Sequence, residues 1–385
     1  SYGFTGNTEI GVYESLATLE SNSWTIGNQL VSGFYPNRIP NPDLKWEKTG
    51  QFDIGFDLGL FNNRLRLTAD YYYKKTTDLL YNVAIPSASG YDSMLKNIGS
   101  VQNKGYELSI ESDNLSGAFS WTTAFNISFN RNKVLELGGE TYKDVGTYDD
   151  HLKTSDIRRL IVGQPIGVFY GYRFDGIFQN EAECAQQTSS PSPIGVGLRR
   201  YKDLNGDGKI DATNDREILG DANPKFFGGM TNTFAYRGFE LNVFLQYSYG
   251  NKIFNYNAME LESPTGGQNV YQDLVNRWTP TNPSNEYQKA TTNRNNIVSD
   301  RFIEDGSFLK LKTVSLSYSF PKLNWKHIGG LRLYVTGQNL LTWTKYRGYD
   351  PEVSYRGAST LEAGEDFGGY PQARTFMFGI KLDIK

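Results

Sequence analysis

QFDIGFDLGLFNNRLRLTADYYYKK, residues 51–75, is the stretch that decides the fold of this chain. In its first half, apolar side chains occupy the even positions 52–60, while polar side chains or glycine occupy the odd positions. This alternation is typical of a β-strand with one apolar face. After Asn62-Asn63 the apolar residues occupy the odd positions 65–73. The stretch is therefore predicted to form a two-stranded hairpin with one wholly apolar face.

The register of this hairpin follows from its turn. Asn tolerates the positive φ that both central residues of a tight two-residue turn require. With Asn62 and Asn63 at those positions, the predicted pairs are Leu60–Leu65, Leu58–Leu67, Phe56–Ala69 and Ile54–Tyr71 on the apolar face, and Asp57–Thr68 and Asp53–Tyr72 on the polar face.

The same two-faced pattern recurs along the chain, in residues 106–129, 314–335 and 376–384. A second tight turn is expected at Arg237-Gly238. It would pair Tyr236 with Phe239, Phe234 with Leu241, Met230 with Leu245 and Thr233 with Asn242. The pattern predicts about ten strands, of which the first is a stub that ends near Thr5.

Connections between the predicted strands alternate in length. Short links fall near residues 61–64, 112–117, 236–239 and 321–330, whereas long polar links fall near residues 7–44, 80–103, 132–227, 251–307 and 343–373. Transmembrane β-barrels have short periplasmic turns and long extracellular loops, while a soluble sandwich has no reason to place every long loop at one end. The fold is therefore predicted to be all-β, a transmembrane antiparallel β-barrel whose C-terminus at Lys385 is periplasmic.

Two segments within the long links have predicted structure of their own. Residues 166–178 look like a strand, and we expect this strand to project from the barrel within a loop; the alternative is that it spans the membrane with an unseen partner. A short helix is expected at residues 271–278.

Composition excludes several classes of protein. Aromatic residues make up 14% of the chain, with 26 Tyr and 23 Phe, yet mean hydropathy is only −0.52, and no run of about eighteen apolar residues occurs. A helical membrane protein is therefore not expected. The net charge of −3 argues against a nucleic-acid surface. One cysteine, Cys184, and two distant histidines, His151 and His327, exclude a Cys/His zinc cluster. Ser1 and the absence of a signal segment after it suggest the later part of a longer polypeptide.

A family resemblance is carried, in order and over nearly the whole chain, by residues 41–72, 103–111, 162–179, 203–211, 224–253, 276–283, 307–321 and 331–343. Among them are PKFFGGMTNTFAYRGFELNVFLQYSYGNKI at 224–253 and LRLYVTGQNLLTW at 331–343. These stretches resemble the C-terminal half of the SusC/RagA family of TonB-linked outer-membrane transporters of Bacteroidota. The resemblance implies that residues 1–385 are part of a 22-stranded barrel domain. It also implies an N-terminal plug and TonB box that these residues do not contain, a SusD-like surface lipoprotein as lid, and an oligosaccharide or peptide as substrate.

The sharpest local motif is DLNGDGKID at residues 203–211. Oxygen side chains at the first, third, fifth and ninth positions, glycine at the sixth and a carbonyl at the seventh match the start of an EF-hand calcium loop. The twelfth position is Asn214, so the closing carboxylate is displaced to Asp215. We expect Ca²⁺ or another hard cation in the extracellular loop 179–226; the alternative is a polar turn that binds nothing. The expected ligands are Asp203, Asn205, Asp207, the Lys209 carbonyl, Asp211 and Asp215.

Candidate solute contacts fall into two groups. Polar residues predicted on the inner face are Arg66, Asp70, Tyr72, Glu107, Glu111, Glu240, Asn242, Gln246, Arg332 and Gln338. We take Arg66, Tyr72 and Arg332 as substrate-binding candidates, although such residues also hydrate a lumen or hold a plug. Aromatic residues in the last long loop, Trp343, Tyr346 and Tyr349, are candidates to stack on sugar rings; for Trp343 anchoring at the membrane border is an equal or better explanation.

Two functions from different classes remain. The first is a subunit of an energised importer of glycans or peptides. The second is a plugless barrel that acts as a scaffold or passive pore, and a soluble all-β glycan-binding protein is a distant third. An enzyme is not expected, because the chain has no Ser/His/Asp ordering tied to an elbow motif and no phosphate-binding glycine loop before a helix.

Overall fold

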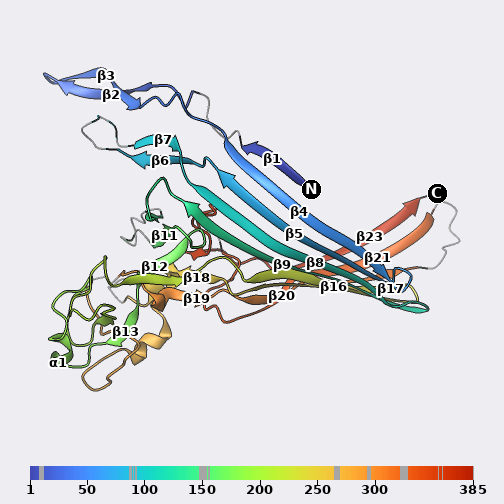
Figure 1. Cartoon of the computed structure of the whole chain (residues 1–385). Coiled ribbons are helices and arrows are strands. Elements are labelled where there is room, and N and C mark those ends of the chain that lie inside the picture. The colour runs from blue at the N-terminus through green and yellow to red at the C-terminus, as the bar shows by residue number, and fades with distance from the viewer. Residues whose placement is uncertain are drawn as a thin grey trace.

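The structure is a computed structural model that describes residues 1–7, 13–85, 89, 91, 93–146, 154, 157–263, 269–292, 296–320, 328–353, 355–357 and 359–384. His151, His327, Lys385 and most of the predicted turn at 321–330 lie outside these residues. Within them, ten strands form one antiparallel sheet in the order β1-β4-β5-β8-β9-β16-β17-β20-β21-β23 (Figure 1). We call this sheet the wall. Its strands are β1 Tyr2–Asn7, β4 Glu47–Leu60, β5 Leu65–Thr77, β8 Ser100–Leu115, β9 Phe119–Glu136, β16 Phe226–Tyr236, β17 Phe239–Tyr249, β20 Phe308–Ser319, β21 Ile328–Thr344 and β23 Thr375–Ile384.

The number of strands and the predicted register are confirmed. The wall is open, with β1 and β23 as its edges in the described residues, and β1 is the expected stub. All six predicted pairs between β4 and β5 are present, and Asn62 and Asn63 have φ of 57° and 62°. The four predicted pairs between β16 and β17 are also present, and Gly238 has the positive φ of 89° that its turn requires.

The apolar face of the wall is largely exposed, as the lipid-facing side of a membrane strand is. Aromatic residues gather at two levels on this face. Near the short turns, the rings of Phe239 and Tyr318 are 4.5 Å apart; near the long loops, those of Phe226 and Tyr249 are 5.0 Å apart. On β9, Phe119 lies at the level near the short turns and Phe129 at the level near the long loops. The strand between them has about ten residues, each of which adds roughly 3.3 Å. With a tilt of about 40°, this length spans about 25 Å, the height of the apolar band of a transmembrane barrel.

Long connections leave the wall at one end and short turns close the other (Figure 1). Two hairpins extend from the long-loop end, β2 Thr18–Ile26 with β3 Gln29–Arg38, and β6 Leu80–Ala84 with β7 Ser93–Asn97. The alternation of short and long links predicted from the sequence is thus observed in the described residues.

The remaining long connections fold together into a compact part that we call the loop lobe. It contains a sheet of β10 Tyr142–Val145, β11 Arg158–Ile161, β12 Val168–Tyr172 and β15 Arg216–Gly220. Smaller sheets pair β13 Phe174–Ile177 with β14 Arg199–Tyr201, and β18 Lys252–Asn255 with β19 Ile303–Asp305 and β22 Glu365–Asp366. Its helices are α1 Glu181–Cys184, α2 Tyr256–Leu261 and the 3₁₀ helices η2 Gln272–Asn276 and η3 Asp300–Phe302.

The buried core lies in the loop lobe, where Phe169, Phe254, Tyr256, Met259 and Phe302 pack together with almost no exposure. Residues 166–178 form β12 and β13 in this lobe, as expected, and do not join the wall. The helix expected at 271–278 is a 3₁₀ helix, whereas the α-helix at 256–261 was not predicted. No helix among the described residues is both long enough and apolar enough to cross a membrane.

Candidate functional site

A polar hollow of about 420 Å³ lies beside Tyr72 on the polar face of the wall. The Tyr72 hydroxyl donates to Asn130 Oδ1 at 3.1 Å, and Gln51 Nε2 donates to the Asp53 carboxylate at 2.8 Å. Its lining offers hydroxyl, amide and charged groups, which suit a sugar or a peptide backbone. The lining residues are Gln51, Asp53, Tyr72, Lys74, Asn103, Glu107 and Asn130.

The other two predicted polar contacts are not part of this hollow. Arg66 pairs with Glu111 at 3.0 Å near the short turns. Arg332 donates to Glu240 at 2.6 Å and to Ser317 at 2.7 Å, and its strand β21 is separated from β5 by five strands of the wall. The structure therefore does not bring Arg66, Tyr72 and Arg332 together, and both arginines are neutralised by carboxylates.

The three predicted sugar-stacking aromatics have three different environments. Trp343 is paired with Leu309 on the apolar face and is 51% exposed, which favours membrane-border anchoring. Tyr346 was a candidate because the last long loop was expected to expose it, but it is only 5% exposed, and its hydroxyl donates to Asp366 in the loop lobe, so its ring is not presented to a solute. Burial and this hydrogen bond raise the pKa of Tyr346. Tyr349 is 82% exposed and remains accessible to a solute.

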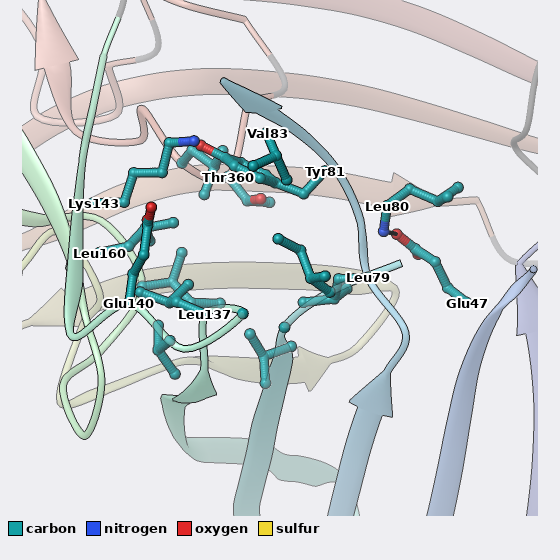
Figure 2. A pocket seen from close by; sticks show the side chains of 17 residues that line it. Glu47, Leu79, Leu80, Tyr81, Val83, Leu137, Glu140, Lys143, Leu160 and Thr360 are labelled. Atoms are coloured by element: carbon teal, nitrogen blue, oxygen red, sulfur yellow. Dashed lines mark hydrogen bonds between the residues drawn. The ribbon is translucent and has the colours of Figure 1, made fainter. Parts of the chain in front are cut away.

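An apolar cavity of about 410 Å³ lies at the long-loop end of the wall (Figure 2). On one side, Lys143 Nζ lies 3.7 Å from the centroid of the Tyr81 ring. The Leu80 amide donates to Glu47 at 3.0 Å and fixes the start of β6. The lining is mainly aliphatic, which suits an apolar group better than a sugar. The apolar lining residues are Leu79, Leu80, Tyr81, Val83, Ile98, Val101, Val134, Leu137, Leu160, Ile166 and Leu361.

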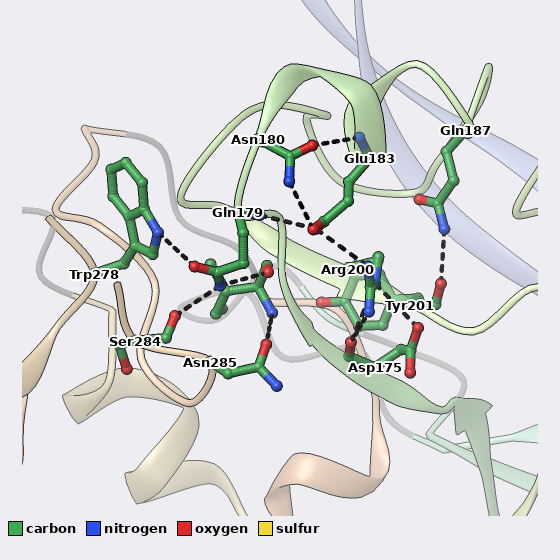
Figure 3. A network of polar contacts seen from close by, with 11 residues as sticks. Asp175, Gln179, Asn180, Glu183, Gln187, Arg200, Tyr201, Trp278, Ser284 and Asn285 are labelled. Atoms are coloured by element: carbon green, nitrogen blue, oxygen red, sulfur yellow. Dashed lines mark hydrogen bonds and ion pairs between the residues drawn. The ribbon is translucent and has the colours of Figure 1, made fainter. Parts of the chain in front are cut away.

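A polar network not anticipated from the sequence joins two segments of the loop lobe (Figure 3). Trp278 Nε1 donates to Gln179 Oε1 at 3.1 Å, and Gln179 Nε2 donates to the Ser284 carbonyl at 3.0 Å. Arg200 pairs with Glu183 at 3.3 Å. Asn180 caps α1 by accepting from the Glu183 amide at 2.9 Å. The Asn-x-x-Glu spacing of a capping box was the available sequence signal for this element.

Buried ion pairs also hold the loop lobe together. Arg158 Nε donates to Glu365 at 2.9 Å, and both side chains are 1% exposed. The pKa of Glu365 is raised above its ordinary value, because the effect of burial outweighs the opposing effect of the Arg158 charge. Glu262 accepts from Arg301 at 2.6 Å and pairs with Arg347 at 3.2 Å. These pairs join segments of the loop lobe that are far apart in the sequence.

The predicted cation loop lies between β14 and β15, within the expected range 179–226. Asp203 accepts from the Gly206 and Gly208 amides at 2.6 and 2.7 Å, and these bonds lower its pKa. Asp215 is fully buried and accepts from the Leu204 and Asp211 amides at 2.8 Å each. No group of three His, Cys, Asp or Glu side chains among the described residues converges as a metal site. The remaining predicted ligands, Asn205, Asp207 and Lys209, bond to one another within the same loop.

Comparisons with known proteins agree with this geometry. A family model described as TonB dependent receptor-like, beta-barrel, matches residues 15–177. TonB-dependent receptor P3 of Formosa agariphila is 41% identical over 99% of this chain and 38% of its own length. TonB-dependent receptor SusC of Bacteroides thetaiotaomicron is 28% identical over all of this chain and 37% of its own length.

The solved structure of the RagAB peptide transporter is 28% identical, with a TM-score of 0.81 over 99% of this chain and 40% of that chain. This chain therefore spans about two fifths of the length of the relatives that it matches. These relatives are receptors and transporters, and none is an enzyme. Over 99% or more of its length, the chain is therefore similar to part of the TonB-dependent receptors of the SusC and RagA type, and the family model that it matches describes the β-barrel of such receptors.

Proposed function

We propose that this chain is the barrel part of an energised importer in the outer membrane of a Gram-negative bacterium. In this proposal the long-loop end is extracellular and the C-terminus is periplasmic. A SusD-like lipoprotein covers the loop end, and TonB acts through a plug carried by another part of the full-length protein. The observation that supports it best is the two-faced wall of ten strands, apolar on one side and polar on the other, in a chain similar over 99% of its length to RagAB.

The proposed substrate is an oligosaccharide or a short peptide. The hollow beside Tyr72 supplies hydrogen-bonding groups for either class, and the cavity beside Leu160 supplies an apolar surface. The similar solved structure of RagAB is that of a peptide transporter. The lumen residues Arg66 and Arg332 are assigned to holding the barrel interior, because carboxylates already neutralise them.

The test is uptake of labelled oligosaccharides and labelled peptides by cells that produce the full-length protein. Energised import requires that removal of TonB abolishes uptake. A passive pore instead admits small solutes into liposomes in the absence of TonB. Uptake that persists without TonB and matches liposome permeation would support the pore and overturn the importer.

We further propose that the loop of residues 203–215 binds Ca²⁺. Asp203, Asp207 and Asp211 carry carboxylates within one short segment, and the buried Asp215 accepts hydrogen bonds from the Leu204 and Asp211 amides of the same loop. A hard cation needs several such oxygens from one short segment, and ordering this loop is the role that it would have.

A further inference from the structure

Five cationic side chains lie on the apolar, lipid-facing side of the wall, at its long-loop end. We call them the outer-face basic patch; all five are exposed, and they are Lys48, Lys75, Lys104, Arg131 and Lys133. Their face follows from the register. Lys75 shares strand β5 and residue parity with the apolar-face residue Tyr73, and Lys104 is paired directly with Tyr73. The patch therefore lies just beyond the aromatic level at this end.

A hollow of about 270 Å³ opens within the patch. Lys48 and Lys75 line it together with aromatic rings, and Lys48 Nζ lies 4.6 Å from the centroid of the Phe4 ring. Gly50 keeps the hollow open, because a Cβ at this position would lie 3.1 Å from the Phe4 ring. Its lining combines cations with apolar surface, and it consists of Tyr2, Phe4, Lys48, Gly50, Phe52, Tyr73, Lys75 and Thr77.

The charges of this patch are not balanced within the protein. None of the five cations forms an ion pair with a carboxylate in the part of the chain that the structure describes, whereas Arg66 and Arg332 on the polar face are both paired. Lys104 is also directly opposite Arg131 in the pairing of β8 with β9. Like charges at opposite positions of neighbouring strands are unfavourable, and a bound anion removes this repulsion.

We propose that the outer-face basic patch binds a lipid with a phosphate-bearing headgroup in the leaflet at the long-loop end. The phosphate contacts Lys48, Lys75 and Lys104, and the acyl chain lies along Phe52 and Tyr73 toward the middle of the membrane. Basic residues at a membrane surface attract anionic headgroups, and aromatic residues favour the same depth. This proposal goes beyond import, because it requires only that the apolar face of the wall is in a membrane.

The test uses the purified full-length protein, stripped of lipid in detergent, and native mass spectrometry to measure bound lipid. The probes are phosphorylated lipid A, the same lipid A with its phosphates removed, and inorganic phosphate. The variant is the double substitution Lys48→Gln with Lys75→Gln. The matched control is Lys74→Gln, which removes the neighbouring charge on the opposite face, where Lys74 lies 5.7 Å from the Tyr72 ring. A second variant, Lys104→Gln, tests the patch without altering the hollow.

Loss of each lysine is expected to weaken binding of phosphorylated lipid A by about fivefold. The wild-type protein is expected to prefer the phosphorylated form by about tenfold or more, and Lys74→Gln to bind as the wild type does. The proposal is overturned if both forms of lipid A bind equally, or if Lys74→Gln weakens binding as much as the double variant. It is also overturned if inorganic phosphate at the lipid concentration displaces the lipid, since the site would then recognise free phosphate.

Discussion

The ring of Tyr72 lies against the backbone of Gly105 on the neighbouring strand. The two residues are paired in register, and a Cβ at Gly105 would approach the Tyr72 hydroxyl to 2.6 Å and the Phe129 carbonyl oxygen to 2.4 Å. Glycine at this position therefore allows the tyrosine to lie flat on the wall and to line the polar hollow. This contact connects the strand register to the proposed solute site.

Substitution Gly105→Ala is expected to displace Tyr72 and to destabilise the barrel by about 1–3 kcal/mol, as overpacking does elsewhere. Urea unfolding of the full-length protein in detergent measures this change. Gly3→Ala is the control, because a Cβ at Gly3 has no neighbour within 4 Å. Equal stability of the two variants would show that Tyr72 does not occupy the position described.

Substitution Glu365→Gln is expected to destabilise the loop lobe by about 3–5 kcal/mol, because it leaves the buried Arg158 charge uncompensated. The measurement is the urea concentration at which protease begins to cut the lobe. Glu111→Gln is the control: it breaks the exposed pair with Arg66 and is expected to cost about 1 kcal/mol or less. Similar losses in the two variants would contradict the burial of the Arg158–Glu365 pair.

Acid is expected to release the segment around Asp350 from the wall. Burial tends to raise the pKa of Asp350, but the hydrogen bond from Lys310 at 2.7 Å and backbone bonds lower it below its ordinary value of 3.8. A carboxyl with a lowered folded-state pKa contributes stability above its unfolded pKa and loses that contribution as the pH falls through the folded pKa.

The protection factor for hydrogen exchange of residues 348–353, which corrects for the pH dependence of the intrinsic exchange rate, should therefore be high at pH 6 and should fall as the pH falls below 3.8. Asp350→Asn is expected to show low protection factors at both pH values. Slow exchange of this variant at pH 6 would mean that Glu352, which also contacts Lys310, holds the segment by itself.

Calcium at millimolar concentration is expected to protect residues 203–215 from protease and to raise the melting temperature, since it binds the folded loop. The double variant Asp203→Asn with Asp207→Asn should lose both effects. Magnesium is the control cation, because it requires a stricter octahedral geometry. An unchanged melting temperature with calcium, and no bound metal, would remove the proposed site.

The register of the wall could be predicted from sequence, because a strand with one apolar face has a strict period of two and the turns at Asn62 and Arg237 fix the pairing. The same rule fails where a bulge shifts the alternation. The register between β20 and β21 shifts between Leu311 and Thr313, and this shift places Leu309, rather than the even-numbered residues that follow the parity of Leu316, on the apolar face. The alternation of apolar and polar residues in the sequence does not by itself show where such a bulge occurs.

The loop lobe could not be predicted in the same way. Its defining contacts join residues such as Arg158 and Glu365, which are 207 positions apart. Tyr346 illustrates the consequence: its neighbours in sequence are polar and typical of an exposed loop, yet distant segments bury it. The motif at residues 203–211 can be read from the sequence because its residues are contiguous, and its binding of a cation stays a prediction. The hollow beside Tyr72, by contrast, is formed by strands that meet only in the sheet.

The central claim is that the apolar face of the wall contacts lipid and the polar face encloses an aqueous interior. Spin labels at Leu241 and at its neighbour Asn242 test it most directly, in the full-length protein in a bilayer with Cys184 replaced by serine. The expected result is relaxation of the Leu241 label by oxygen, which partitions into lipid, and of the Asn242 label by a water-soluble nickel chelate. Relaxation of both labels by the nickel chelate would contradict the claim.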